Sequence, residues 1–147
     1  MHKLSSNLFV TNVTAEYAEK MMTLGHTIYA ILINFKSYGI ILFILPFKRK
    51  IGATHCTELN YIFGANIFPI PFKCTKTDEY VRNVTSKLWT NFSKFGNPNG
   101  ANNMSTLEGF KWLPVVRKPT CYLSIGTDAF QMKEEYYYHQ TKFWQNF

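Results

Sequence analysis

The amino-acid sequence predicts an α/β fold that is incomplete within its 147 residues. Residues 27–35, TIYAILINF, are almost continuously apolar and rich in β-branched and aromatic side chains. This pattern is typical of a strand buried on both faces of a parallel sheet. Apolar residues recur every three or four positions in residues 77–95, which predicts a long amphipathic helix. Residues 120–125, TCYLSI, predict a second strand. Two strands cannot form such a sheet, so we expect the chain to be part of a larger one.

A short helix is expected before the first strand. It covers residues 15–24, with Thr14 as its N-cap and Gly25 as its stop. Its expected apolar face consists of Ala18, Met21 and Met22. Residues 38–50, after the first strand, fit no regular element.

Two helices are predicted between the strands. The first begins near Glu58 and ends at Gly64, after a loop at residues 52–57. Its expected inner side chains are Leu59, Ile62 and Phe63. The second covers residues 77–95 and ends at Gly96. Its stripe, which we expect to be core together with Trp89, consists of Val81, Val84, Leu88, Phe92 and Phe95. Residues 133–147 are expected to form an aromatic-rich helix or coil.

Composition and charge exclude several classes of protein. Apolar residues make up 46% of the chain and aromatic residues 17%, so the chain is neither disordered nor fibrous. The net charge is +7, but the basic residues are scattered and their longest run is Lys48-Arg49-Lys50. We interpret this charge as a solvated surface and expect no nucleic-acid partner. The longest apolar run, residues 40–47, is far shorter than the about 20 residues of a membrane-spanning helix.

Cysteines and glycosylation motifs bear on the compartment. The three cysteines, Cys56, Cys74 and Cys121, match no metal-binding or redox spacing, and their pairing stays open. Four N-x-[ST] motifs favour a secretory history, although the first residues resemble no signal peptide. We therefore expect a secreted protein whose front end is missing. Asn83 and Asn103 are the favoured glycosylation sites, Asn12 is allowed, and Asn91 is disfavoured because it flanks the apolar stripe.

Several motifs along the chain follow a known pattern. Residues 52–64 are GATHCTELNYIFG. This run resembles the loop that carries the catalytic histidine in type-B carboxylesterases and cholinesterases, and the resemblance is greatest to insect carboxylesterases. Residues 88–98, LWTNFSKFGNP, are similar to a family helix end with the pattern Trp-Thr-Asn-Phe-Ala-Lys. Further landmarks follow in the family's order: Trp112-Leu113-Pro114, Tyr122-Leu123-Ser124-Ile125 and Phe143-Trp144.

The resemblance implies a fold and a site. The expected fold is the C-terminal portion of an α/β-hydrolase, a mostly parallel sheet flanked by helices, with residues 1–147 forming part of one domain. His55 is implied as the triad histidine, which moves protons between the nucleophile and the leaving alcohol. Glu58 is implied as a carboxylate near the triad, and helix-dipole complementarity explains it equally well. The nucleophile motif Gly-x-Ser-x-Gly is absent, and we assign no triad acid.

The implied function is that of a serine hydrolase acting on small carboxylic esters, without a metal or organic cofactor. The chain alone should be inactive, because it carries one triad member of three. Two alternatives remain open. One is a cholinesterase-like adhesion or binding protein that has lost the nucleophile. The other is a truncated product without function, which aggregation through an unpaired sheet edge would support. The chain departs from the family pattern at residues 40–46 and at Cys56.

Overall fold

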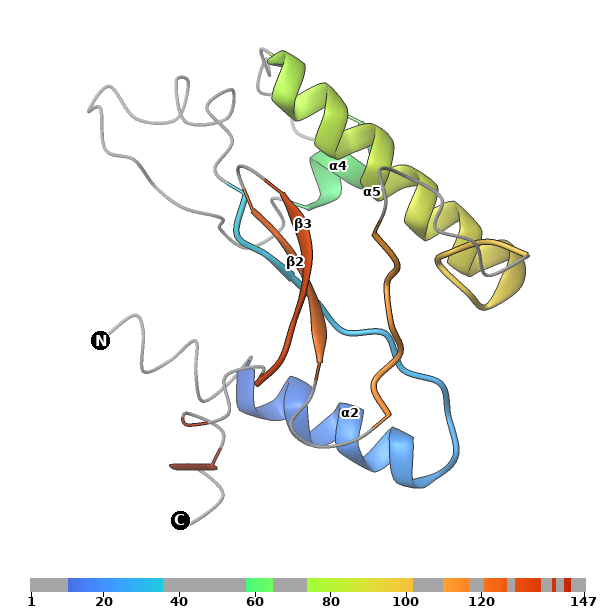
Figure 1. Ribbon diagram of the computed structural model, residues 1–147, viewed down its shortest axis with the longest axis vertical. Coiled ribbons are helices and arrows are strands. Elements are labelled where there is room, and N and C mark those ends of the chain that lie inside the picture. Colours follow the sequence, from blue (N-terminus) through green and yellow to red (C-terminus); the bar gives the residue numbers. More distant parts are fainter. Residues whose placement is uncertain are drawn as a thin grey trace. The chain divides into compact units, whose positions relative to one another are not determined.

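The computed structural model describes residues 11–35, 58–64, 74–101, 110–116, 121–126, 129–135, 139 and 142–143. The elements in chain order are α2 (Val13–Thr23), β1 (Ile31–Ile33), α4 (Leu59–Phe63), α5 (Lys76–Phe95), β2 (Tyr122–Ile125) and β3 (Phe130–Lys133) (Figure 1). The chain divides into two compact units, of which one contains α2 and the other contains α4 and α5. The predicted segment 38–50 lies outside the described residues.

The three strands form one sheet in the order β1-β2-β3. The backbone N–H of Leu123 donates to the Ala30 carbonyl at 2.9 Å, and that of Asn34 donates to the Ile125 carbonyl at 2.8 Å. Because these bonds advance in the same direction along both strands, β1 and β2 are parallel, as predicted. β2 and β3 form an antiparallel hairpin, in which the Gly126 N–H donates to the Ala129 carbonyl at 3.1 Å (Figure 1).

Two features of the sheet differ from the prediction. β3 was not expected, because its sequence FQMK contains no β-branched residue and only Phe130 is buried. The side chains of Ile31, Leu32 and Ile33 are half-buried rather than buried on both faces. A strand is fully buried only where helices cover both faces of the sheet, and the described sheet is small.

Trp112 and Val115 hold an extended segment beside the start of the first strand. The Val115 N–H donates to the Ile28 carbonyl at 2.8 Å in an antiparallel bridge. The indole nitrogen of Trp112 donates to the Ala30 carbonyl at 3.0 Å, and its ring meets the edge of Tyr29 at 5.8 Å between centroids. Trp112 of the Trp-Leu-Pro landmark therefore has a structural role, because it contacts the backbone and a side chain next to β1.

Helix α2 begins earlier than predicted, at Val13 with Asn12 as the N-cap residue. Thr14 is thus an exposed residue within the first turn and not the cap. The Asn12 side chain donates to Glu16 Oε1 at 2.8 Å, an interaction one turn apart that favours the earlier start. Ala15 and Ala18 form the buried face, and Gly25 follows the helix with φ of +82°, as its role as a stop requires.

Helix α5 is capped at both ends. The Thr75 side chain accepts from the Asp78 N–H, the Asp78 carboxylate accepts from the Thr75 N–H, and Gly96 ends the helix with φ of +65°. Val81, Val84 and Leu88 are buried, as the stripe predicts. The prediction that the stripe is core throughout is wrong for this chain, because Phe92 and Phe95 are 47% and 51% exposed.

Helix α4 packs against α5 through a different face from the predicted one (Figure 1). Asn60 and Tyr61 are buried, whereas Phe63 is 73% exposed and Leu59 and Ile62 are half-buried. In a helix of five residues the apolar pattern is too short to define a face. The polar groups of Tyr61 decide the orientation, because they find hydrogen-bond partners on α5.

Candidate functional site

The predicted histidine lies just outside the described residues. His55 belongs to segment 36–57, whereas Glu58 is described as the N-cap residue of α4. The Glu58 carbonyl accepts from the N–H groups of Tyr61 and Ile62, at 2.9 and 3.0 Å, and its half-buried side chain makes no capping bond. Glu58 lies three positions after His55 in the sequence, so α4 begins shortly downstream of the predicted catalytic histidine.

A buried tyrosine fixes α4 to α5. The Tyr61 hydroxyl donates to Asp78 Oδ1 at 3.0 Å, and the Ser86 hydroxyl donates to the Tyr61 carbonyl at 2.9 Å. The ring of Phe35 meets that of Tyr61 edge to face, with centroids 5.4 Å apart. Tyr61 is 1% exposed and Phe35 2%. Helix α4 is thus held by polar and aromatic contacts at one residue.

Asp78 is fully buried, with an exposed fraction of 0%. Besides Tyr61, its carboxylate accepts from the Thr75 N–H at 2.9 Å and from the Thr75 hydroxyl at 2.6 Å, both at Oδ2. Hydrogen bonds to both oxygens compensate for the loss of water around the carboxylate. The helix predicted over residues 77–95 includes Asp78 near its start, but the prediction did not include this cluster. The spacing Thr-x-x-Asp was a usable signal for the cap, whereas nothing local pointed to Tyr61.

The described residues include two of the three cysteines, Cys74 and Cys121, and both are half-buried. Burial raises the pKa of the Cys74 thiol above its usual value, Arg82 opposes this, and Asp78 and Glu79 add to it. The Cys121 thiol lies 3.4 Å from the Pro114 carbonyl oxygen. Cys56 lies outside the described residues, so the pairing of the three cysteines stays open. Burial likewise raises the pKa of Tyr29.

The four glycosylation motifs differ in accessibility. Asn83 is exposed on α5. Asn12 is only 8% exposed and donates to Glu16, and Asn91 donates to the Pro98 carbonyl at 3.0 Å. Asn103 lies outside the described residues. Among the described candidates, the Asn83 side chain is thus the most accessible.

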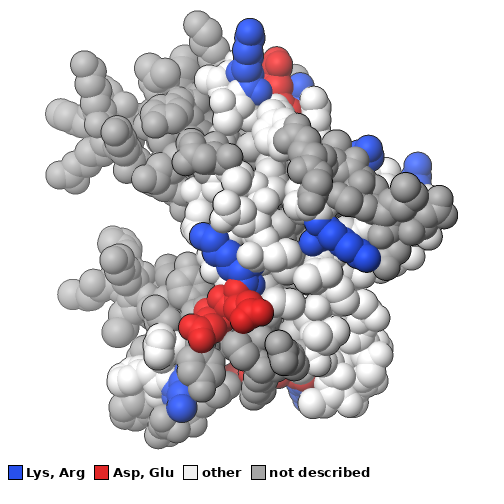
Figure 2. All heavy atoms as spheres, viewed as in Figure 1, with Lys and Arg blue, Asp and Glu red and all other residues white. Residues whose placement is uncertain are grey.

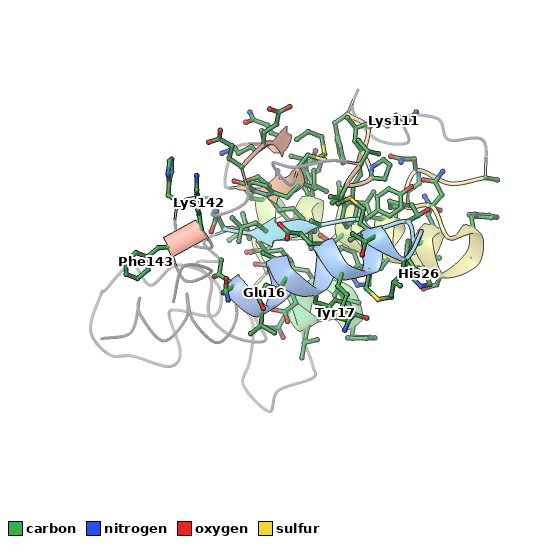
Figure 3. The ribbon with its side chains drawn as sticks, turned by 90° about the horizontal axis from the view of Figure 1, so that it is seen from below. Glu16, Tyr17, His26, Lys111, Lys142 and Phe143 are labelled. Atoms are coloured by element: carbon green, nitrogen blue, oxygen red, sulfur yellow. The ribbon has the colours of Figure 1, made fainter. Side chains whose placement is uncertain are left out.

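Neither of the two described histidines lies in the histidine-loop motif. His26 is exposed beyond the end of α2 (Figure 3), and His139 is exposed near the end of the chain. Across the described ranges, no three histidine, cysteine or acidic side chains gather as metal ligands would. No helix in this part of the chain is both long and apolar enough to cross a membrane. Basic side chains are dispersed among uncharged ones in Figure 2.

Comparison with known proteins decides the family. The model of the carboxylesterase family matches residues 1–144. The chain belongs to the carboxylesterase family. The esterase cest-33 of Caenorhabditis elegans is 41% identical over 68 residues, which are 46% of this chain and 12% of that protein. Mouse cholinesterase is 28% identical over 105 residues, which are 70% of this chain and 16% of that protein. Rat bile salt-activated lipase is 31% identical over 100 residues, 67% of this chain and 16% of that protein.

The fold also has a solved counterpart. Juvenile hormone esterase from Manduca sexta superposes with a TM-score of 0.68 at 21% identity, over 98% of this chain and 27% of that chain. The described fold is therefore part of an α/β-hydrolase fold. This carboxylesterase-family chain spans only 12% to 16% of the length of the three relatives above. The family prediction is confirmed, and the roles of His55 and Glu58 stay predictions.

Proposed function

We propose that this chain is the C-terminal, histidine-bearing part of a serine hydrolase that cleaves small carboxylic esters. The observation that carries the proposal is the run GATHCTELNYIFG at residues 52–64, within a chain that matches the carboxylesterase family over residues 1–144. The anchored helix α4 supports it, because a catalytic base on a loop needs a fixed neighbour to hold its geometry.

His55 has two tasks in this mechanism. As a general base it takes the proton of a serine hydroxyl while the serine oxygen attacks the ester carbonyl. It then gives that proton to the oxygen of the departing alcohol. The acyl group stays on the serine as an acyl-enzyme. In the second half His55 activates a water molecule in the same way and returns the proton to the serine. The serine, the triad acid and the oxyanion hole are proposed to come from the remaining part of the hydrolase, which would carry the motif Gly-x-Ser-x-Gly. Glu58 is proposed to lie near the triad and to influence the histidine indirectly.

Activity assays on two proteins test this proposal. The isolated chain should not turn over short-chain nitrophenyl esters, because it contains no nucleophile elbow. When the chain replaces the matching segment of Manduca sexta juvenile hormone esterase, the joined protein should hydrolyse these esters and bind one organophosphate per molecule. Stoichiometric labelling of the isolated chain, or a folded joined protein without activity, would contradict the proposal. The first result would point to a nucleophile within this chain, and the second to a binding or non-functional product.

Secretion and glycosylation at Asn83 are a second part of the proposal. The exposed position of Asn83 on α5 supports it, and Asn103 and Asn12 are the further candidates. The chain should be expressed behind a secretory leader in insect cells and treated with an N-glycosidase. Asn83→Gln should remove a glycan-dependent mass shift. Asn91→Gln is the matched control on the same helix and should leave the shift in place. A shift that survives Asn83→Gln unchanged would contradict the assignment.

A further inference from the structure

A buried hydrogen bond joins the helix after the histidine loop to the first turn of α5. It runs from the Tyr61 hydroxyl to Asp78 Oδ1 at 3.0 Å, and both side chains are almost completely excluded from solvent. We propose that Tyr61 and Asp78 are positioning residues for His55, which they hold in place by fixing α4. This inference rests on the proposed role of His55 and adds two residues to it.

The shortness of α4 makes such an anchor necessary. The helix has five residues, and isolated helices of less than about 12 residues are marginal in water. Its position must therefore come from tertiary contacts. α5 supplies two of these, Asp78 for the hydroxyl and Ser86 for the carbonyl of Tyr61. α5 has 20 residues with a cap at each end, so it is a rigid support.

The two oxygens of the Asp78 carboxylate have different hydrogen-bond partners, which supports a positioning role. Oδ2 accepts both bonds from Thr75 in the capping box, and Oδ1 accepts from Tyr61. The cap therefore fixes the rotamer of Asp78, and the fixed carboxylate presents Oδ1 to α4. Stability alone is weak grounds for such a group, because well-packed apolar side chains often replace buried charges without loss. A directional contact that fixes one orientation of α4 explains it better.

Because α4 follows His55 closely in the sequence, a fixed position of α4 also restricts His55 in this proposal. Tyr61 lies six residues after His55, and the Tyr61 N–H bonds back to the Glu58 carbonyl at 2.9 Å. If the Tyr61 side chain loses its partner, α4 can shift or rotate, and Glu58 at its start moves with it. Misplacement of a catalytic base by about 1 Å can lower the rate about 100-fold.

Kinetics in the joined protein test the proposal. Tyr61→Phe should lower kcat about 10-fold with little change in KM, because substrate contacts are kept while the base is displaced. Tyr80→Phe is the matched control, since Tyr80 lies on α5 and packs against Phe130. It should leave kcat within about twofold of the parent protein. Asp78→Asn keeps one side-chain oxygen for the three donor groups of Tyr61 and Thr75, so its kcat should fall between those of Tyr61→Phe and the parent.

A double-mutant cycle separates positioning from general stability. Once His55→Ala has removed the base, Tyr61→Phe should cause no further loss of kcat, because it acts through the same imidazole. An equal loss with and without His55, or a loss no larger than that of Tyr80→Phe, would overturn the proposal. If His55→Ala itself kept full activity, the proposed function would fail instead, so the two failures are distinguishable.

Amide hydrogen exchange on the 147-residue chain tests the structural half without the joined protein. Tyr61→Phe should speed exchange of the Tyr61 and Ile62 amides, which bond to Glu58, at least about 10-fold relative to Tyr80→Phe. Unchanged exchange at these two amides would overturn the proposal, even if the joined protein did not fold.

Discussion

The two ends of helix α5 belong to one apolar stripe but have different surroundings. Towards the N-terminus, Val81, Val84 and Leu88 are buried and α4 packs alongside. Towards the C-terminus, Phe92 and Phe95 continue the same spacing but are about half exposed. An apolar stripe thus identifies the apolar face of a helix, whereas the burial of that face depends on the other elements that pack against it. This chain covers 27% of the juvenile hormone esterase that it resembles in fold.

The buried end of α5 also makes the hydrogen bond to α4. Asp78 and Tyr61 join α5 to α4 there, and Tyr61 lies six positions after His55 in the chain. The part of the helix whose packing is complete within this chain is thus the part that supports the proposed catalytic loop. At the exposed end, we expect other parts of a larger hydrolase to pack against Phe92 and Phe95.

Alanine substitutions at the two ends should have the most unequal effects. Leu88→Ala should lower the free energy of opening of α5 by about 2–5 kcal/mol, because Leu88 is 1% exposed and its loss leaves a cavity. Phe95→Ala should cost less than about 1 kcal/mol, because half of its side chain is already in water. Amide hydrogen exchange of the α5 backbone measures both in the isolated chain. Equal costs at the two positions would mean that the exposed end is as well packed as the buried end.

Joining the chain to the rest of a hydrolase should narrow this difference. The cost of Phe95→Ala should then rise to about 3 kcal/mol or more, as expected for a buried aromatic residue. Chemical unfolding of the joined protein with and without the substitution measures the rise. If the cost stayed below about 1 kcal/mol, Phe95 would be a surface residue of the complete protein and not part of its core.

The cap of α5 should contribute less than its core. Thr75→Ala should destabilise the helix by about 1 kcal/mol, because the Asp78 N–H loses its side-chain acceptor. Thr77→Ala is the control, since Thr77 is an exposed residue of the same turn. Hydrogen exchange at the first turn of α5 compares the two. If both substitutions had the same effect, the capping box would not contribute to the stability of this end.

The smallest effect is expected beside the cap, at Cys74. Since its pKa is raised, Cys74 should be alkylated by iodoacetamide more slowly at pH 8 than a cysteine in an unfolded peptide. The folded state holds the thiol proton more tightly than the unfolded state does. The resulting stability is therefore present at low pH and is lost as the pH rises from the unfolded to the folded pKa. A rate equal to that of the unfolded peptide would show that burial does not suppress the thiolate.

Local signals in the sequence predicted the parts of the fold that local physics decides. The stop at Gly96, the parallel strand at residues 31–33 and its partner Tyr122–Ile125 follow from capping, propensity and patterning. Tertiary contacts decided the rest. The Tyr61 face of α4 is buried because Tyr61 forms hydrogen bonds with Asp78 and Ser86 on α5. These two residues lie 17 and 25 positions away from Tyr61 in the chain. A polar partner so distant leaves no trace in the spacing of apolar residues.

The candidate site shows the same division. Its histidine was predicted from a run of motif residues, and the family match supports that run. The residues that anchor its neighbouring helix could not be predicted in this way. Asp78 fits equally well as a simple helix-cap residue, and Tyr61 fits equally well as one more apolar ring.

The most direct test of the account is the effect of His55→Ala on kcat in the joined, active protein. We expect a loss of about 10⁴-fold or more, because the serine loses its general base while substrate binding is largely kept. Glu58→Gln should lower kcat about 10-fold to 100-fold, and His26→Ala and His139→Ala should change it little. If His55→Ala kept most of its activity while His26→Ala or His139→Ala lost it, residues 52–64 would not be the catalytic loop.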